Sequence, residues 1–261
     1  MERAFSAAGA SLRWVHVGLA GVEHLLFPRL VESSVTLTNA RGAFSSSLGE
    51  WAVFACLFFA KRYAAVRAAH VERRWDRLVV GEIRGATLGV IGYGDIGRDA
   101  ARKAAALGMR VLAVRRRAQS SAGGDGLAEA VHPIGDLLAV LSQCDYVLLA
   151  LPLTESTKGL FGAPELAAMK PSAVLINVGR GGVLDEAALT DALAGERLAG
   201  AALDVFQTEP LPTDSPLWSM QDKVLLSAHC ADLTPAYLED SMSVFTRNHA
   251  RFIEGKGFDA G

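Results

Sequence analysis

The sequence lacks the features that mark several classes of protein. Its three cysteines in 261 residues lie far apart, without metal-ligand or redox spacing. This favours free thiols in the cytoplasm and predicts no metal site. Charges of both signs are mixed along the chain, with 26 Lys and Arg against 28 Asp and Glu, so we expect no nucleic-acid partner. The longest apolar run, Trp51 to Ala60, is about half of what crosses a bilayer, so we expect no membrane partner. A short organellar leader stays open as an alternative to the cytoplasm.

Short apolar segments alternate with Ala-rich and Leu-rich helical stretches. Each segment has roughly four to six apolar residues bounded by Gly, Asp, Asn or Arg, which is typical of strands covered by helices on both faces. The alternation predicts an α/β fold with a doubly wound parallel sheet, the Rossmann architecture. The predicted strands are ATLGVIG (86–92), RVLAVR (110–115), DYVLLAL (145–151), AVLINV (173–178), GAALDVF (200–206) and KVLLSAH (223–229).

The segments on either side of this pattern look different. LRWVHVGLAG (12–21) and SVTLTNARG (34–42) predict two further strands, and residues 45–75 predict one long helix. Apolar residues between 234 and 252 recur at a nearly helical spacing and predict a helix that packs on the N-terminal segment. We therefore predict three parts: a substrate-domain segment with an interdomain helix (1–75), a dinucleotide-binding domain (76–232) and a returning C-terminal helix (233–261).

The stretch GYGDIG matches G-x-G-x-x-G and lies between a predicted strand and a predicted helix. In this context Gly92 permits a tight turn, Gly94 lets the backbone approach a pyrophosphate, and Gly97 lets helix and strand pack closely. The amides near Asp95 and Ile96 are expected to face a phosphate at the helix N-terminus. The stretch predicts a dinucleotide site.

Basic residues occupy the place where an acid usually binds the adenosine ribose. That acid is expected about 20 residues after the glycines, where this chain has Arg115, Arg116 and Arg117. A guanidinium cannot accept a hydrogen bond from a 2′-hydroxyl, but it can bind a 2′-phosphate through two hydrogen bonds. This favours NADP over NAD. NAD, or a solvated basic loop without a ligand, is the alternative.

Three later motifs occur in a fixed order. They are NVGRGGVLDEAAL with Arg180, ALDVFQTEPLP with Asp204 and Glu209, and LLSAHCADLT with His229. With these motifs the chain, from about Leu12 almost to its C-terminus, resembles the D-isomer-specific 2-hydroxyacid dehydrogenases. The resemblance implies hydride transfer between NAD(P)H and a small 2-oxo acid such as glyoxylate or hydroxypyruvate.

The resemblance also implies roles for the residues of these motifs. Arg180 matches the arginine that binds the substrate carboxylate, His229 the general acid/base, Glu209 its carboxylate partner, and Asp204 the acid near the nicotinamide carboxamide. The chemistry asks for these residue types, because a developing alkoxide needs a proton donor and an imidazole can supply one near neutral pH. A neighbouring carboxylate favours the protonated imidazole, and a forked guanidinium suits a planar carboxylate.

Further contacts are implied on both ligands. GLAGVEHLLFP (18–28) matches a loop whose amides hold the substrate carboxylate, which places this contact at Ala20, Gly21 and Val22. LPLTESTKGLF (151–161) matches the stretch beside the adenosine half of the cofactor. The remaining implied cofactor contacts are Leu151, Pro152, Val178, Asp204 and His229.

The chain departs from the family pattern at its N-terminal side. Members usually carry a complete flavodoxin-like substrate domain, of which only the last two strand signals are recognisable before the helix at 45–75. We therefore expect a truncated substrate domain. Two consequences follow from the resemblance: a homodimer formed through the long helix, and, as an alternative to the enzyme, a catalytically impaired NAD(P)-binding regulatory or corepressor-like protein.

Overall fold

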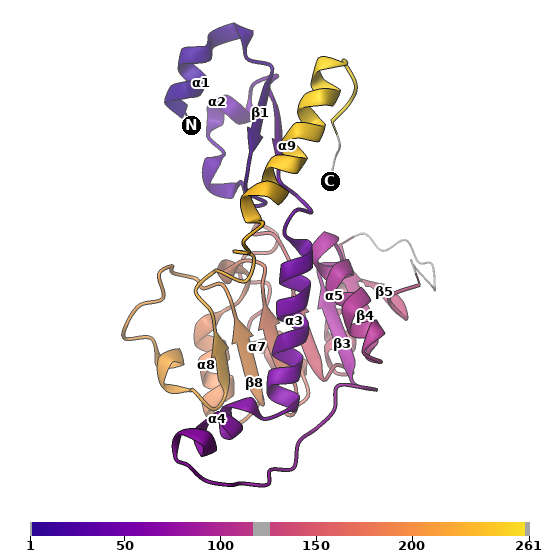
Figure 1. Cartoon of the computed structure of the whole chain (residues 1–261), viewed down its shortest axis with the longest axis vertical. Coiled ribbons are helices and arrows are strands. Elements are labelled where there is room, and N and C mark those ends of the chain that lie inside the picture. The colour runs from indigo at the N-terminus through magenta and orange to yellow at the C-terminus, as the bar shows by residue number, and fades with distance from the viewer. Residues whose placement is uncertain (1, 117–125, 259–261) are drawn as a thin grey trace. The chain divides into compact units, whose positions relative to one another are not determined.

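The computed structural model describes residues 2–116 and 126–258 (Figure 1). The chain divides into a small unit, formed by Met1–Phe44 and Asp232–Gly261, and a large unit, Ser45–Ala231. The predicted boundary at residue 232 lies at the end of the large unit. The structure groups residues 45–75, which the prediction assigns to the substrate-domain segment, with the large unit.

The large unit is built on a parallel sheet of seven strands in the order β5-β4-β3-β6-β7-β8-β9. All six strands predicted from the sequence for this region are present, and the doubly wound parallel fold is confirmed. β5 is an edge strand that the apolar pattern did not indicate. The strands are β3 (Thr87–Ile91), β4 (Arg110–Arg115), β5 (Ala130–Pro133), β6 (Tyr146–Leu149), β7 (Val174–Asn177), β8 (Gly200–Leu203) and β9 (Val224–Leu226).

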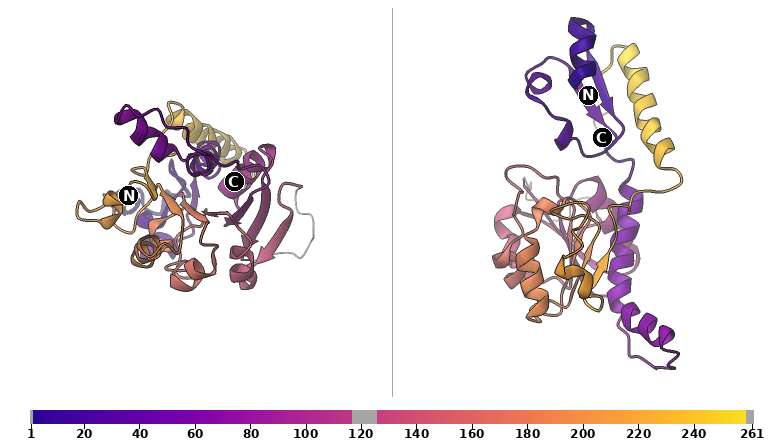
Figure 2. Two further views of the ribbon diagram at one scale, coloured as in Figure 1. Left: turned by 90° about the horizontal axis from the view of Figure 1, so that it is seen from below. Right: turned by 90° about the vertical axis from the view of Figure 1, so that its left-hand side faces the viewer.

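Helices cover both faces of this sheet (Figure 2). One face carries α3 (Ser45–Ala60) and α5 (Asp95–Ala106), and the other carries α6 (Leu137–Leu141), α7 (Ala163–Ala168) and α8 (Glu186–Ala194). Successive strand side chains alternate between the two faces. Because both faces are buried, the strands read as continuous apolar runs. The core between the sheet and α6, α7 and α8 includes Ile91, Leu149, Leu175, Leu189 and Leu203.

The apolar run at Trp51–Ala60 lies in α3, where one side of the helix is buried and Phe54 on another side is 48% exposed. Ala52, Ala55 and Cys56 are almost completely buried. At Gly49 the helix approaches α5 so closely that an added Cβ would lie 3.0 Å from the backbone nitrogen of Ala100. Within the residues that the structure describes, no helix has both the length and the apolar content needed to cross a membrane.

The long helix predicted for residues 45–75 is wrong, because the chain forms two helices, α3 and α4 (Tyr63–Val71). Arg62 between them has φ +52°, in the left-handed region that ends a helix. A distant segment takes over the helix end: the Gly81 amide donates to the carbonyl of Ala60 at 2.7 Å, and the Lys61 ammonium donates to the Gly81 carbonyl at 2.8 Å. Tertiary hydrogen bonds therefore replace the next helical turn.

The small unit pairs two parallel strands, β1 (Trp14–Val17) and β2 (Thr36–Asn39), with α9 (Tyr237–Ile253). Trp14 stacks on Phe245 of α9 at 5.5 Å between ring centroids, and Ser241 donates to the carbonyl of Gly18 at 2.8 Å. The C-terminal helix α9 thus packs on the N-terminal strands. The remaining helices of this unit are α1 (Glu2–Ala8), α2 (Pro28–Val31), and the 3-10 turns η1 (Gly9–Ser11) and η2 (Glu23–Leu25).

Candidate functional site

The glycine loop follows β3 at the point where the strand order of the sheet reverses. β3 lies between β4 and β6, and in open α/β sheets ligands bind outside the carboxyl ends of the strands at such a point. Gly92 has φ +99°, and an added Cβ would collide with the carbonyl of Ala150. A Cβ on Gly97 would collide with the carbonyl of Gly92 and the side chain of Val90. Neither position has room for a side chain.

Gly94 differs from these two glycines, because an added Cβ would meet nothing within 4 Å. It precedes α5, whose first residue is Asp95, and its carbonyl accepts the Arg98 amide at 2.8 Å. The first amides of this 12-residue helix have no partner within the helix and favour an anion. The open space beside them fits the pyrophosphate of a dinucleotide, so the predicted residues suit the predicted group.

The predicted 2′-phosphate contacts lie at the end of the neighbouring strand. Arg115 is the last residue of β4, opposite Pro133 of β5, and both Arg115 and Arg116 are exposed. Arg117 lies outside the described residues. Two exposed arginines thus lie at the carboxyl end of the strand next to β3.

Three of the four predicted residues of the later motifs follow three adjacent strands. Arg180 comes after β7, Asp204 directly after β8 and His229 after β9. Since these strands are parallel neighbours, their carboxyl ends lie at one edge, the same edge that carries the glycine loop. The loops that follow β7 and β8 touch, because a Cβ on Gly181 would collide with the backbone of Phe206.

Glu209 and His229 form a hydrogen-bonded pair. The imidazole Nδ1 lies 2.7 Å from Glu209 Oε2, and the side chains are 44% and 35% exposed, respectively. The other oxygen, Oε1, accepts the backbone amide of Phe206 at 2.9 Å. With Nδ1–H donating to the carboxylate, Nε2 is the nitrogen that can exchange a proton with a ligand. The carboxylate is fixed at both oxygens and orients the ring.

Asp204 is almost completely buried, at 1% exposed. Its Oδ1 accepts the Ser227 hydroxyl at 2.6 Å and the amides of Cys230 and Ala231 at 3.0 and 3.2 Å. Its carbonyl accepts the His229 amide at 2.8 Å, where His229 itself has φ +49°. Asp204 therefore fastens the segment that carries the histidine to the end of β8, a role that the sequence motif did not indicate.

Arg180 is half-buried at the end of β7, and its guanidinium donates to the carbonyl of Gly179 at 2.8 Å. The turn before it is held by Asn177, whose side-chain oxygen accepts the Gly179 amide at 3.1 Å. Asn177 is completely buried. The backbone that presents Arg180 is thus fixed by a buried amide side chain.

The predicted adenosine-side contacts lie in the loop after β6, next to this turn. A Cβ on Gly179 would lie 2.6 Å from the carbonyl oxygen of Leu151, so the two loops touch. Leu151 is half-buried and Pro152 is exposed, whereas Val178 is buried. Leu151 and Pro152 are therefore more accessible to a nucleotide than Val178 is.

Ala20, Gly21 and Val22 belong to the small unit, whereas all other predicted site residues belong to the large unit. They follow β1 in a compact loop. The Asn39 side chain donates to the carbonyl of Ala20 at 2.5 Å, and the Leu25 amide donates to the carbonyl of Val22 at 2.9 Å. Hydrogen bonds to the carbonyls of Ala20 and Val22 therefore hold this loop in place.

The sequence pattern alone does not single out Glu186 and Gln207, which join two of the loops. The Gln207 amide donates to the carboxylate of Glu186, and its side-chain nitrogen donates to the carbonyl of Leu184 at 2.7 Å. Both residues lie inside the recognised motifs, Glu186 in VLDEAAL and Gln207 in DVFQTEP. Their place in these motifs is the sequence feature that could have identified them.

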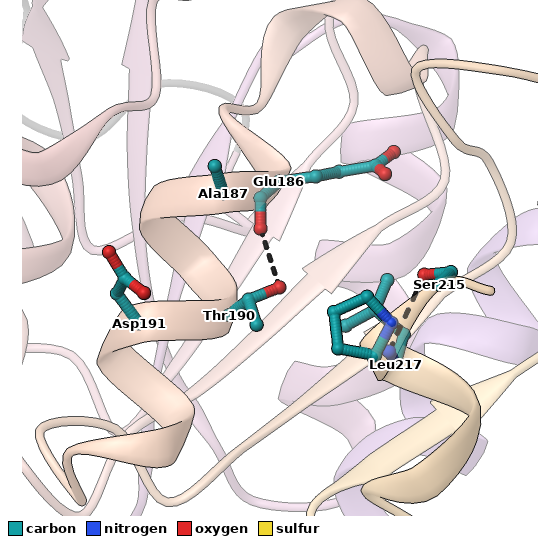
Figure 3. A pocket seen from close by; sticks show the side chains of 7 residues that line it. Glu186, Ala187, Thr190, Asp191, Ser215 and Leu217 are labelled. Atoms are coloured by element: carbon teal, nitrogen blue, oxygen red, sulfur yellow. Dashed lines mark hydrogen bonds between the residues drawn. The ribbon is translucent and has the colours of Figure 1, made fainter.

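A shallow pocket lies between α8 and the 3-10 turn η5 (Pro216–Ser219) (Figure 3). None of Arg180, Glu209 and His229 lines it. Among the described residues, no cluster of His, Cys, Asp and Glu side chains is arranged to hold a metal ion. The pocket is lined by Glu186, Ala187, Thr190, Asp191, Ser215, Pro216 and Leu217.

Known proteins resemble this chain in both sequence and fold. The profile of the D-isomer specific 2-hydroxyacid dehydrogenase NAD binding domain matches residues 53–231. The (S)-sulfolactate dehydrogenase of Chromohalobacter salexigens is 35% identical over 237 residues, which are 90% of this chain and 75% of that protein.

Two solved structures resemble the whole chain. The NADPH-dependent glyoxylate/hydroxypyruvate reductase of Sinorhizobium meliloti, in complex with NADP and sulfate, has a TM-score of 0.83 at 31% identity, covering 95% of this chain and 78% of that one. A D-isomer specific 2-hydroxyacid dehydrogenase family protein of Aeromonas salmonicida has a TM-score of 0.85 at 33% identity, covering 98% and 80%. Together with the profile match, these likenesses establish that the chain belongs to the D-isomer specific 2-hydroxyacid dehydrogenases, with a Rossmann NAD-binding domain as its large unit.

Proposed function

We propose that the protein reduces a small 2-oxo acid, glyoxylate or hydroxypyruvate, to the D-2-hydroxy acid with NADPH as hydride donor. The observation that carries the proposal is the hydrogen bond of 2.7 Å between His229 and Glu209 at the edge of the sheet that also carries the glycine loop. An oriented imidazole beside a dinucleotide site is what the reaction requires. The same pair favours the enzyme over the regulatory alternative, in which nothing needs a proton donor.

The cofactor is proposed to bind along the carboxyl edge of β3, β4 and β6. Gly92, Gly94 and Gly97, with the amides of Asp95 and Ile96, hold the pyrophosphate at the start of α5. Arg115 and Arg116 bind the 2′-phosphate. The NADP complex of the Sinorhizobium meliloti relative supports NADP over NAD. When bound, NADPH supplies the hydride. The other proposed contacts are Leu151, Pro152, Val178, Asp204 and His229.

The substrate is proposed to be held by charge and to be protonated by the histidine. Arg180 offers a forked cation that pairs with the carboxylate and polarises the 2-oxo group. His229 donates the proton from Nε2 to the oxygen that becomes the hydroxyl. Glu209 keeps Nδ1 protonated and stabilises the imidazolium before that transfer. In the oxidation direction the same nitrogen takes the proton back.

A further proposed contact of the substrate carboxylate is the loop after β1 in the small unit. The backbone amides of Ala20, Gly21 and Val22 are the proposed donors. The hydrogen bonds described above engage the carbonyls of Ala20 and Val22. Backbone donors to a carboxylate add to the guanidinium without adding charge.

The test is the disappearance of NADPH absorbance with glyoxylate, hydroxypyruvate and 3-sulfopyruvate, alongside fluorescence titration of NADPH binding. We expect turnover with glyoxylate or hydroxypyruvate and a D-configured product by chiral chromatography. Tight NADPH binding without turnover on any acid would contradict the enzyme and favour the regulatory alternative. Preferred turnover of 3-sulfopyruvate would contradict the substrate assignment.

We also propose that the protein is a cytoplasmic homodimer. The surface of α3, α4 and the segment that follows exposes large apolar side chains, and contiguous exposed apolar surface is typical of an interface. Light scattering after size exclusion measures the mass directly, and a monomer would contradict the proposal. The three free cysteines support the reducing compartment. The exposed apolar side chains are Phe54, Tyr63, Val66, Val71 and Trp75.

A further inference from the structure

A second carboxylate, that of Glu186, is attached to the turn that carries Glu209. The Gln207 amide donates to Glu186 Oε1, and the adjacent Phe206 amide donates to Glu209 Oε1 at 2.9 Å. Two successive backbone amides of one turn therefore bind two different carboxylates. The Gln207 side chain adds a third bond, to the carbonyl of Leu184 at 2.7 Å.

Glu186 is itself firmly placed, because it lies in the first turn of α8. Asp185 caps this helix by accepting the Ala188 amide at 3.0 Å. The carbonyl of Glu186 accepts the Thr190 hydroxyl at 2.8 Å (Figure 3). A side chain on a capped helix is a better anchor than one on a loop, since its own backbone is fixed.

We propose that Glu186 is a positioning residue for the Glu209–His229 pair. It holds the Gln207 peptide, this peptide sets where the Phe206 amide and the Glu209 side chain lie, and Glu209 orients the imidazole. The inference rests on the proposed function in that the imidazole is the proton donor. Glu186 acts through the turn and touches neither the substrate nor the cofactor in this arrangement.

The charge on Glu186 is held by the same hydrogen bond. Burial raises the pKa of the Glu186 carboxyl and the nearby Glu209 carboxylate adds to this, whereas the Gln207 amide lowers it. The amide thus stabilises a charge that the surroundings disfavour. Removing the side chain leaves the Gln207 amide without this acceptor, and the turn is then free to shift relative to His229.

The test compares E186A, E186Q and the control D191N. Gln keeps an acceptor oxygen for the Gln207 amide and Ala does not. Asp191 is an exposed carboxylate further along α8, and Figure 3 shows its side chain leaving the helix on the side opposite to Glu186. D191N therefore removes the same charge from the same helix without touching the turn.

The first measurement is the NMR signal of the Nδ1-bound proton of His229 without ligands, assigned by its loss in H229N. Because this proton lies in the hydrogen bond of 2.7 Å to Glu209, we expect its signal to move or broaden in E186A, where the turn that carries Glu209 is released. D191N is expected to leave the signal unchanged, since Asp191 does not contact the turn.

The second measurement is the pH profile of kcat/KM for 2-oxo acid reduction. In E186A we expect kcat to fall about tenfold, because a small misplacement of an acid/base group is costly, and the pH profile to differ from that of wild type, whereas the profile of D191N is expected to match wild type. NADPH affinity is expected to stay within about twofold. E186Q is expected to recover kcat to within about threefold of wild type, since its amide oxygen can accept the same bond.

The two readouts separate the possible failures. An unchanged signal of the His229 Nδ1 proton in E186A, with a lower melting temperature, would show that Glu186 merely stabilises the start of α8, and the inference would be overturned. E186Q as damaging as E186A would overturn it as well. A changed signal in E186A, together with a wild-type protein that turns over no 2-oxo acid, would uphold the link between Glu186 and the pair while rejecting the proposed function.

Discussion

The two halves of the large unit's carboxyl edge achieve precision by opposite means. At β3 and β4 the site depends on missing side chains, since Gly92 and Gly97 have no room for a Cβ and Gly94 opens space. At β7, β8 and β9 it depends on side-chain hydrogen bonds, with Asp204 and Glu209 fixing the segments around the histidine. The difference follows from the ligands: a pyrophosphate is recognised by backbone amides at close approach, whereas proton transfer needs one atom held in one place.

The largest effect is expected at the side-chain half, from H229N. Asparagine tolerates the left-handed backbone that His229 adopts at φ +49°, so the fold is expected to survive. The proton donor is lost, and kcat is expected to fall by about 10²- to 10⁴-fold. Steady-state kinetics measure the loss, with NADPH binding by fluorescence as the control. A kcat within a few-fold of wild type would contradict this prediction, because the oriented imidazole would then not be needed for catalysis.

The glycine half is tested by G97A against G94A. Because an added methyl at Gly97 collides with backbone, G97A is expected to lower the free energy of unfolding by about 1 to 3 kcal/mol. G94A has open space and an ordinary φ of −94°, so its stability is expected to be unchanged while its methyl weakens NADPH binding. Chemical denaturation and fluorescence titration separate the two effects. Equal destabilisation by both variants would contradict the different roles of the two glycines.

A smaller effect is expected from R115D, which sharpens the cofactor side of the comparison. A charge-assisted contact to a 2′-phosphate contributes about 1.5 to 3 kcal/mol, so the ratio of kcat/KM for NADPH to that for NADH is expected to fall by about ten- to a hundredfold. R116D is the companion variant. If neither variant changes the ratio, the exposed arginines do not bind the cofactor, and the preference for NADP fails.

The smallest effect is expected from D99N, in the helix that begins at the glycine loop. Burial raises the pKa of Asp99, but hydrogen bonds from Lys103 and Arg102 outweigh it, so the pKa is lowered overall. A lowered pKa in the folded state stabilises the protein above the unfolded value and loses this contribution as the pH falls through the folded value. We expect D99N to cost about 1 kcal/mol near neutral pH and the difference from wild type to shrink as the pH falls through the lowered pKa of Asp99. Urea denaturation across pH measures this, and a pH-independent difference would contradict it.

The parts of the fold that depend on local pattern could be predicted from the sequence. The six apolar runs predicted strands correctly because both faces of the sheet are buried. The glycine motif predicted its loop correctly because only glycine fits at Gly92 and Gly97. The helix break at Arg62 could not be predicted, since it depends on hydrogen bonds from Gly81 and Lys61. β5 is a short edge strand with a histidine and a proline, which weakens its apolar signal.

The candidate site divides in the same way. The motifs around Arg180, Glu209 and His229 were recognisable from the sequence, and the structure brings the last two into contact. The contacts of Asp204 with Cys230 and Ala231 depend on which strand lies next to which, and sequence order does not show that. The hydrogen bond between Glu186 of α8 and Gln207 in the loop after β8 is likewise visible only in three dimensions.

The three cysteines differ in exposure, and this makes one of them suited to chemical labelling. Cys56 and Cys144 are buried, whereas Cys230 is exposed and directly follows His229. A maleimide fluorophore is therefore directed to one place beside the proposed proton donor without any engineering. Its emission would report in real time when ligands arrive at that end of the sheet.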